Sequence, residues 1–387
     1  MNAAAKTKPH ASSKAVVLDA IRAAGTISRA GLVGATGFTG PTITAVVRKL
    51  IEEGLVVESG RAESTGGKRR ILLRLDHSAR YAVGVHLDHG GMVYVLTDLA
   101  GAVVTRMAKP GVGVEEPRAA VEAMAREISG LIDSAGVERH RVLGVGVVFA
   151  DAGFPLSESL EQATGLPVVL DNDATAAALG EHWAGGFGGA SAAAALYLGT
   201  RISAGLVING ITYRGPGGKA GDLAHVCVEA DGPRCRCGAR GCLDVLAGPA
   251  AVVAAARADL LVPMLRSREP SVAADFAALS RSARRGEPRA LALLERSARY
   301  IAAAARTLSA IMDLQVLVLT GPGFSIAGSV YLPVIEKELS PAVDVRLSRL
   351  AATASAVGAA ALVLESELVP LSLGARLPEN LSSEAIH

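Results

Sequence analysis

Between residues 14 and 75, apolar side chains recur first at helical and then at strand spacing. Three short stretches, 13–25, 28–37 and 39–55, carry apolar residues three or four positions apart, as amphipathic helices do. Ser28 and Thr39 are good N-caps for the second and third stretches. Residues 55–59 and 69–75 are typical of two strands joined by a tip rich in glycine and charge. The pattern predicts three helices followed by a hairpin, with a short turn between the second and third helices.

From residue 80 the pattern changes to a strand-rich arrangement that occurs twice. Residues 81–110 indicate three strands separated by glycine turns, followed by an amphipathic helix and two buried strands. After residue 190 the same order of strands begins again, helices follow over 245–313, and a late buried strand and a closing helix complete the chain. Two copies of a β-β-β-α-β plan predict a two-lobed, actin-like (ribonuclease H-like) body of the ATPase type.

The predicted fold class is therefore α/β, with an N-terminal winged helix-turn-helix in front of this body. We expect the winged helix over 14–76, a first lobe over 80–182 completed by a helix at 354–368, and a second lobe over 183–353. The two ends of the chain, 1–13 and 371–387, have no periodic pattern and are expected to be disordered.

Charge is unevenly divided between the two parts of the chain. Residues 1–80 contain 13 Lys and Arg against 6 Asp and Glu, a net charge of +7, whereas the whole chain carries only +2. A basic head on a mildly acidic body predicts an anionic partner for the head, with double-stranded DNA as the first choice. The bland alternative is a small protein-interaction module with a solvated basic face.

Residues for DNA contact follow from the positions of the predicted helices and wing. Small polar residues at the start of a recognition helix can approach base edges, and basic residues further along or on the wing can reach phosphates. The candidates are Ser28, Arg29, Thr39, Pro41, Thr42, Thr44, Arg48, Lys49, Arg61, Lys68, Arg69 and Arg70.

Composition limits the compartment. Half of the 387 residues are hydrophobic, but we find no apolar run of membrane-spanning length and no apolar stretch behind the N-terminal lysines. We therefore expect a cytoplasmic protein without a membrane partner, in which cysteines serve as metal ligands or reactive thiols more often than in disulfides.

All four cysteines lie in the stretch HVCVEADGPRCRCGARGC, residues 225–242. Cys235, Cys237 and Cys242 are too crowded for ordinary paired disulfides, and His225 precedes them by ten positions. Three thiolates and one imidazole form a closed tetrahedral set, which predicts a structural Zn²⁺ site. Redox sensing by these thiols is the alternative. Cys227 is expected to be a small buried residue that could replace the histidine as a ligand.

Motifs over residues 14–368 resemble the ROK family of repressors and sugar kinases, in particular its regulators with an N-terminal winged helix. GDLAHVCVEADGPRCRCGARGCLDVLAG is similar to the family's histidine and cysteine signature, and GLPVVLDNDATAAALGE to its N-D-A segment. The head, SRAGLVGATGFTGPTITAVVRKLIEEGLV with STGGKRR, is similar to that of the regulators. The resemblance implies an effector site for a sugar or sugar derivative at Asn172, Asp173, Asp222, His225 and Asp244.

The chain departs from the family's kinases where phosphates would be held. Asp173 matches the general base of the kinases, but Met92 replaces the hydroxyl of the first phosphate turn. In the second turn Arg201, with Ser203 and Ala204, adds side chains, and Pro322 removes a donor from the adenosine side. We therefore expect no catalytic residue, no productive ATP binding and no enzyme activity.

The sugar side departs as well. Asp222 and Asp244 are shorter than the family's glutamates, and the loop that lines the sugar pocket is not found near ADAGF, residues 150–154. The resulting hypothesis is a DNA-binding regulator, expected to be a repressor, acting as a homodimer or homotetramer on an inverted-repeat operator. The alternatives are a sugar kinase with an N-terminal appendage and a DNA-binding dimer without an effector.

Overall fold

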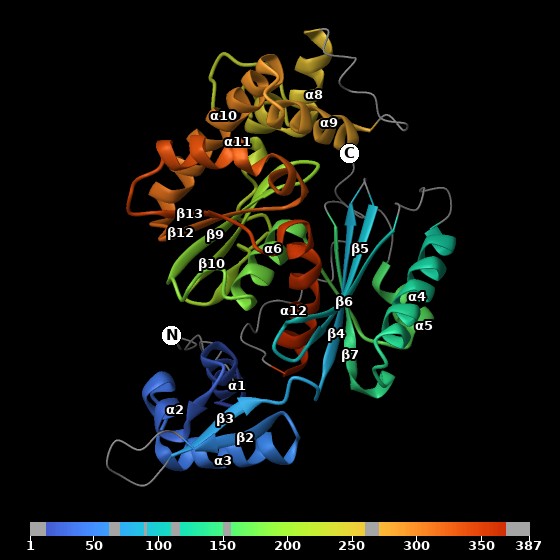
Figure 1. The fold of residues 1–387 in the computed structure, drawn as a ribbon, viewed down its shortest axis with the longest axis vertical. Helices are drawn as coiled ribbons and strands as arrows, with labels where there is room; N and C mark the ends of the chain where they lie inside the picture. Colours follow the sequence, from blue (N-terminus) through green and yellow to red (C-terminus); the bar gives the residue numbers. More distant parts are fainter. Residues whose placement is uncertain are drawn as a thin grey trace, which may run out of the picture.

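The computed structural model describes residues 13–61, 70–88, 91–109, 117–149, 156–259 and 271–368. A small N-terminal head packs below a body made of two sheets and their helices (Figure 1). The prediction of a mixed α/β protein with this division is confirmed.

The head contains three helices and a three-stranded sheet. Its elements are α1 (Ser13–Ala24), β1 (Ile27–Ser28), α2 (Arg29–Thr36), α3 (Gly40–Glu52), β2 (Val56–Arg61) and β3 (Ile71–Leu75). The strand order is β1-β3-β2, and β1 was not anticipated because two residues are too few to show a period. Each helix buries one apolar face in a common core, as the spacing predicted.

The two sheets of the body have the same strand order. The first contains β4 (Tyr81–Asp88), β5 (Gly91–Asp98), β6 (Val103–Lys109), β7 (Val142–Phe149) and β8 (Val168–Asp171). The second contains β9 (Ala192–Leu198), β10 (Ile202–Ile208), β11 (Ile211–Tyr213), β12 (Val316–Thr320) and β13 (Asp344–Leu347). The orders β6-β5-β4-β7-β8 and β11-β10-β9-β12-β13 are identical when each sheet is numbered by itself. In both, the first three strands are antiparallel and the last two join in parallel. The two sheets are thus copies of one plan.

Helices cover the outer face of each sheet. On the first sheet these are α4 (Pro117–Ser134) and α5 (Leu156–Thr164). On the second they are α7 (Leu243–Ala247), α8 (Pro249–Ala258), α9 (Val272–Arg284), α10 (Pro288–Met312) and α11 (Pro322–Glu338). Because α10 is 25 residues long and buries one stripe of its surface, it forms the spine of the second lobe.

Two helices lie between the lobes, and each packs on a different sheet. Helix α12 (Ala354–Leu368) lies against β4 and β7, whereas α6 (Asp173–Trp183) lies against β10 and β9 (Figure 1). The sequence-based division put α6 in the first lobe; in the structure it packs both on α12 and on β10 and β9 of the second sheet. A glycine allows the close packing of α12 on α6, since a Cβ at Gly358 would lie 1.6 Å from the Ala176 carbonyl oxygen.

Helix α12 also explains the most apolar stretch of the chain. Residues Ala351–Leu368 are long and apolar enough to cross a membrane by composition, but most of this stretch is buried within the protein. It forms one continuous apolar cluster with α6 and with the core of the head. The head is thus packed on the body through shared apolar contacts.

Candidate functional site

The helix-turn-helix of the head is closed by the caps that the sequence predicted. The Ser28 hydroxyl accepts from the Gly31 amide at 3.1 Å, and the Thr39 hydroxyl accepts from the Thr42 amide at 3.5 Å. Gly37 ends α2 with φ 71°, a conformation that favours glycine. Helices α2 and α3 meet at a bend of 115°, which is typical of a DNA-binding helix-turn-helix.

Helix α3 presents a polar stripe to solvent. Ile43, Val47 and Leu50 are buried, while the opposite face leaves a set of polar and small residues exposed. The exposed residues predicted to contact DNA are Thr39, Pro41, Thr44, Arg48 and Lys49. Thr42 is half-buried, and its hydroxyl lies 2.9 Å from that of Thr39. The exposed residues of this stripe are of the small polar and basic types predicted to contact DNA.

The other head residues differ in their availability. Arg29 pairs with Glu58 of β2 at 3.2 Å, so its charge is already balanced within the head. Arg70 is exposed beside β3. Lys68, Arg69 and the side chain of Arg61 lie outside the described residues. We therefore base the DNA-contact hypothesis on α3 and Arg70.

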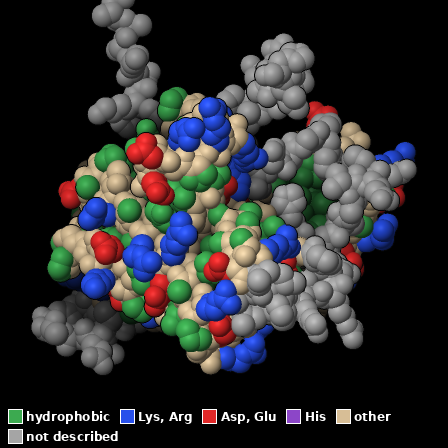
Figure 2. All heavy atoms as spheres, turned by 90° about the horizontal axis from the view of Figure 1, so that it is seen from above, with side chains coloured by type: hydrophobic (Ala, Val, Ile, Leu, Met, Phe, Trp, Pro, Cys, Tyr) green, Lys and Arg blue, Asp and Glu red, His purple; other side chains and the backbone are tan. Residues whose placement is uncertain are grey.

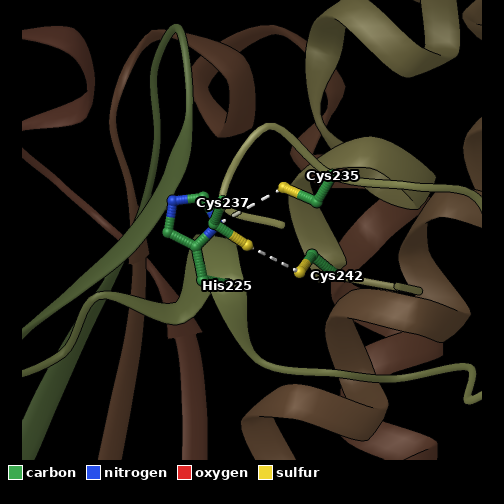
Figure 3. Close-up of side chains that lie close together, drawn as sticks. All are labelled: His225, Cys235, Cys237 and Cys242. Atoms are coloured by element: carbon green, nitrogen blue, oxygen red, sulfur yellow. Dashed lines mark hydrogen bonds between the residues drawn. The ribbon is translucent and has the colours of Figure 1, made fainter. Parts of the chain in front are cut away.

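The cysteine loop brings four possible ligands to one point (Figure 3). The ligand atoms of His225, Cys235, Cys237 and Cys242 all lie within 4.8 Å of one another. Cys235 and Cys237 lie in a tight turn, closed by the Cys235 amide donating to the Ala239 carbonyl at 2.8 Å. Cys242 is the N-cap of α7, and His225 ends a short 3-10 helix. One loop and two helix ends thus converge on a single tetrahedral set.

Two of the distances in this set are close to those that a tetrahedral zinc site needs. Cys237 Sγ and Cys242 Sγ are 3.6 Å apart, and Cys235 Sγ lies 3.5 Å from His225 Nδ1. Tetrahedral zinc bonds of about 2.3 Å to sulfur and about 2.0 Å to nitrogen require separations of about 3.8 and 3.5 Å. The prediction for Cys227 is wrong, because that cysteine is exposed and stands outside the ligand set. Its backbone pairs with Cys242 instead, which turns its side chain to solvent.

The ends of β4 and β9 meet between the lobes, and we call this inter-lobe region the cleft. His86 and Tyr197 are both buried, and the Tyr197 hydroxyl lies 3.2 Å from His86 Nε2. At the last residue of β4 and two positions beyond the end of β9, the Thr200 hydroxyl donates to the Asp88 carboxylate at 3.1 Å. Burial lowers the pKa of His86, although the nearby Asp88 carboxylate opposes that shift. These two contacts join the lobes directly.

Asn172 and Asp173 lie at the start of α6, on the same cleft. The Asn172 side chain caps the helix by accepting from the Thr175 amide at 2.8 Å. Asp173 accepts from the Ala174 amide at 2.8 Å. The pKa of Asp173 is raised to about 6, chiefly by burial; the Asp88 carboxylate adds to this shift, whereas hydrogen bonding and Arg201 oppose it. The carboxyl that matches the kinase base is therefore half-buried, and it faces other charged groups.

The remaining effector-site residues surround the side chain of Arg201. An Nη of Arg201 lies 2.9 Å from His225 Nε2 and 3.8 Å from an Asp222 carboxylate oxygen. Arg201 Nε lies 4.0 Å from Asp244. Burial raises the pKa of Asp244, and the guanidinium opposes this shift. The structure thus brings Asp222, His225 and Asp244 together, with an arginine in their midst.

The turn that carries Arg201 is shorter than its sequence suggested. Gly199 donates its amide to the Arg201 carbonyl at 3.1 Å, so three residues close the hairpin between β9 and β10. Ser203 and Ala204 already belong to β10, away from the turn where they were expected to obstruct a phosphate. Gly205 also belongs to β10, where a Cβ would lie 2.2 Å from the Ala174 carbonyl of α6. Of the three residues expected to obstruct the turn, only Arg201 lies in it.

Sequence reasoning missed the polar contacts that join distant segments. At the head–body junction the Arg22 guanidinium lies 4.5 Å above the Trp183 ring and donates to the Trp183 carbonyl at 3.3 Å. The Trp183 indole donates to Glu365 at 3.4 Å. The only available signal was that Trp183 is the single tryptophan of the chain. Between the lobes, Arg214 pairs with the buried Asp171 at 2.7 Å.

The body surface contrasts with the head. Figure 2 shows that Lys and Arg side chains lie among Asp and Glu on the face seen from above. No single sign dominates that face, so its field offers little attraction to a polyanion. The excess of basic residues counted in the sequence lies instead within residues 1–80.

A helix-turn-helix head and two sheets of one plan, with carboxylates gathered between the lobes, define a class of protein: a helix-turn-helix domain on a body of the sugar-kinase type. The family model of the ROK family matches residues 128–366. The chain therefore belongs to the ROK family.

Relatives and solved structures support this assignment. The chain is 30% identical over 258 residues to a putative xylose repressor of Caldicellulosiruptor sp. (strain Rt8B.4), covering 62% of this chain and 65% of that protein. It is 26% identical over 329 residues to the DNA-binding transcriptional dual regulator NagC of Escherichia coli (strain K12), covering 81% and 80%. The chain thus spans just under two thirds of the xylose repressor.

Solved structures are similar in fold. A ROK family transcriptional regulator, homologous to the E. coli MLC protein, has a TM-score of 0.71 at 22% identity, covering 92% of this chain and 97% of that one. A ROK family glucokinase from Streptomyces griseus, solved with glucose and AMPPNP, has a TM-score of 0.62 at 27% identity, covering 73% and 98%. The first match extends over head and body, and the second over a share that fits the body alone.

Proposed function

We propose that the protein is a DNA-binding transcriptional repressor that acts from a two-lobed body. The observation that carries this proposal is the exposed polar and basic stripe of α3, held at 115° to α2 in front of a ROK body. Relatives over most of the chain are named repressors or regulators, which supports the same assignment. Its site of action is the cytoplasm, where an operator is accessible, and its active form is a homodimer or homotetramer on an inverted repeat.

The body supplies shape and stability in this proposal. The His225, Cys235, Cys237 and Cys242 set holds one structural Zn²⁺, because its distances fit a closed tetrahedral site. The cleft at Asn172, Asp173, Asp222, His225 and Asp244 is the place for an effector. Helix α6 begins at this cleft and ends at Trp183, on which Arg22 of the head rests. A change at the cleft thus has a direct route to the head.

Phosphoryl transfer to a sugar is not part of this proposal. Arg201 adds a long side chain in the turn where a phosphate would need close backbone approach. Pro322 removes a donor at the start of α11. A coupled assay with ATP and a panel of hexoses is expected to give no turnover. Turnover that Asp173→Asn abolishes would replace this proposal with a kinase.

The direct test is selection of bound sequences from genomic DNA, followed by footprinting. We expect one inverted-repeat operator, and equal binding to scrambled DNA would contradict the proposal. Replacing both Arg48 and Lys49 by alanine should weaken binding and lower the slope of log affinity against log salt by up to about 1.8, at about 0.9 per lost phosphate contact. Arg118→Ala, an exposed charge on the body, is the matched control and should change neither quantity.

A further inference from the structure

Arg201 has a fixed origin and a defined set of neighbours. Its turn is closed by the Gly199 amide and fastened to the first lobe by the Thr200–Asp88 hydrogen bond. From this base the guanidinium extends to His225, Asp222 and Asp244. These three residues are the second-lobe part of the proposed effector site, so one side chain of the chain itself contacts all of them.

We propose that Arg201 is a built-in occupant of the effector site, which excludes neutral sugars from it and makes the protein insensitive to them. The inference rests on the proposed function for the location of the effector site, and it adds that Arg201 occupies this site. A neutral sugar would have to displace a cation from two carboxylates and offer only hydroxyl groups in exchange. Because the guanidinium attracts both carboxylates by its opposite charge, and a hydroxyl group carries no net charge, that exchange is unfavourable.

Metal binding would leave the occupant in place. His225 Nδ1 faces Cys235, so a metal bound there leaves the ring proton on Nε2, which then cannot accept from Arg201. Asp222 and Asp244, at 3.8 and 4.0 Å, remain as partners of the guanidinium. In the metal-loaded protein, Arg201 is therefore held in the site by the charges of these two carboxylates and not by His225.

The site has unused capacity for hydroxyl groups once the arginine is removed. Among the described residues, Asp244 Oδ1 and Arg201 Nε are buried without a hydrogen-bond partner. Without Arg201, the carboxylates of Asp222 and Asp244 need donors, and adjacent hydroxyls of a pyranose supply them. The ligand class for the opened site is thus a neutral aldopentose or aldohexose.

The experiment is calorimetric titration of the full-length, zinc-loaded protein with D-xylose, D-glucose and N-acetyl-D-glucosamine. We expect no binding to the wild type and binding of at least one sugar to Arg201→Ala. At about ten times its Kd, that sugar should raise the Tm of the variant by about 2 °C. Arg299→Ala removes an exposed arginine from α10 and should behave as the wild type. Arg201→Ser provides a second opened site if the alanine variant folds poorly.

Two results would overturn the inference: wild type that binds a sugar as tightly as Arg201→Ala, or opened variants that fold and bind none of the three. Operator binding, measured separately by gel shift, should be equal in wild type and Arg201→Ala without sugar. If the wild type does not bind the operator, the proposed function is refuted. The role of Arg201 is decided by the sugar titration alone.

Discussion

Replacing Glu365 by glutamine tests how the head is held on the body. Glu365 lies in the last turns of α12, where the Trp183 indole donates to it at 3.4 Å and Arg22 covers the same indole. Burial raises the pKa of Glu365 from 4.5 to about 7, and Arg22 and Arg214 only partly oppose this shift. Glutamine keeps an oxygen acceptor for the indole and removes the ionisable group.

The sign and size follow from the shift in pKa. The folded protein binds a proton at Glu365 more tightly than the unfolded protein does. This preference contributes fully to stability below pH 4.5, and its contribution is lost as the pH rises through about 7. A rise from 4.5 to about 7 corresponds to about 3 kcal/mol of unfolding free energy. The glutamine variant should therefore be more stable than wild type by about 3 kcal/mol near pH 8.5, and by less than about 1 kcal/mol near pH 5.

The assay is urea unfolding followed by tryptophan fluorescence. Trp183 is the only tryptophan, so its emission reports the junction itself. Glu367→Gln removes an exposed carboxylate two positions along the same helix and should leave the stability unchanged at both pH values. A difference between wild type and Glu365→Gln that stays constant from pH 5 to pH 8.5 would refute the assignment of a buried, proton-binding carboxyl.

Three further predictions concern the metal cluster, the lobe packing and the junction. Cys237→Ser should lower bound zinc well below one ion per chain by elemental analysis and lower the Tm, whereas Cys227→Ser should do neither, because only Cys237 belongs to the ligand set. Gly358→Ala should lower the free energy of unfolding, measured in urea, by at least about 1–3 kcal/mol, because the added Cβ overpacks the contact with α6. Gly130→Ala should raise it by up to about 1 kcal/mol, because this helical glycine has open space around it. Arg22→Ala should cost about 1 kcal/mol and shift the tryptophan emission to longer wavelength, since the indole loses its cover; an unchanged emission maximum would contradict the stacked geometry.

Local signals predicted the head and the duplicated body. Caps such as Ser28 and Thr39 act within three residues, so they are legible in the sequence. The equal order of the two sheets follows the repeated order of strands along the chain. Strand β13 and helix α11 were not predicted, because neither carries a clear apolar period. The position of helix α6 between α12 and the second sheet was not predicted, since tertiary packing determines it.

The candidate site was likewise predictable from the sequence only in part. The metal cluster was predictable because its three cysteines are close in sequence and their chemistry is specific. Whether Cys227 is buried or exposed was not predictable, because this depends on how its backbone pairs with Cys242. Arg201 was recognised only as an obstacle to phosphate. Its contact with His225, 24 residues away, and that of Arg22 with Trp183, 161 residues away, are set by the fold.

The cleft and the junction are connected by one rigid element. Helix α6 has 11 residues and spans about 16 Å, with Asp173 at one end and Trp183 at the other. It packs on α12 through glycines that leave no slack, and α12 carries Glu365 under the same tryptophan. Any motion of α6 at the cleft must therefore move Trp183 or break its contacts with Arg22 and Glu365. With Arg201 filling the cleft, as we infer, a neutral sugar does not drive that motion.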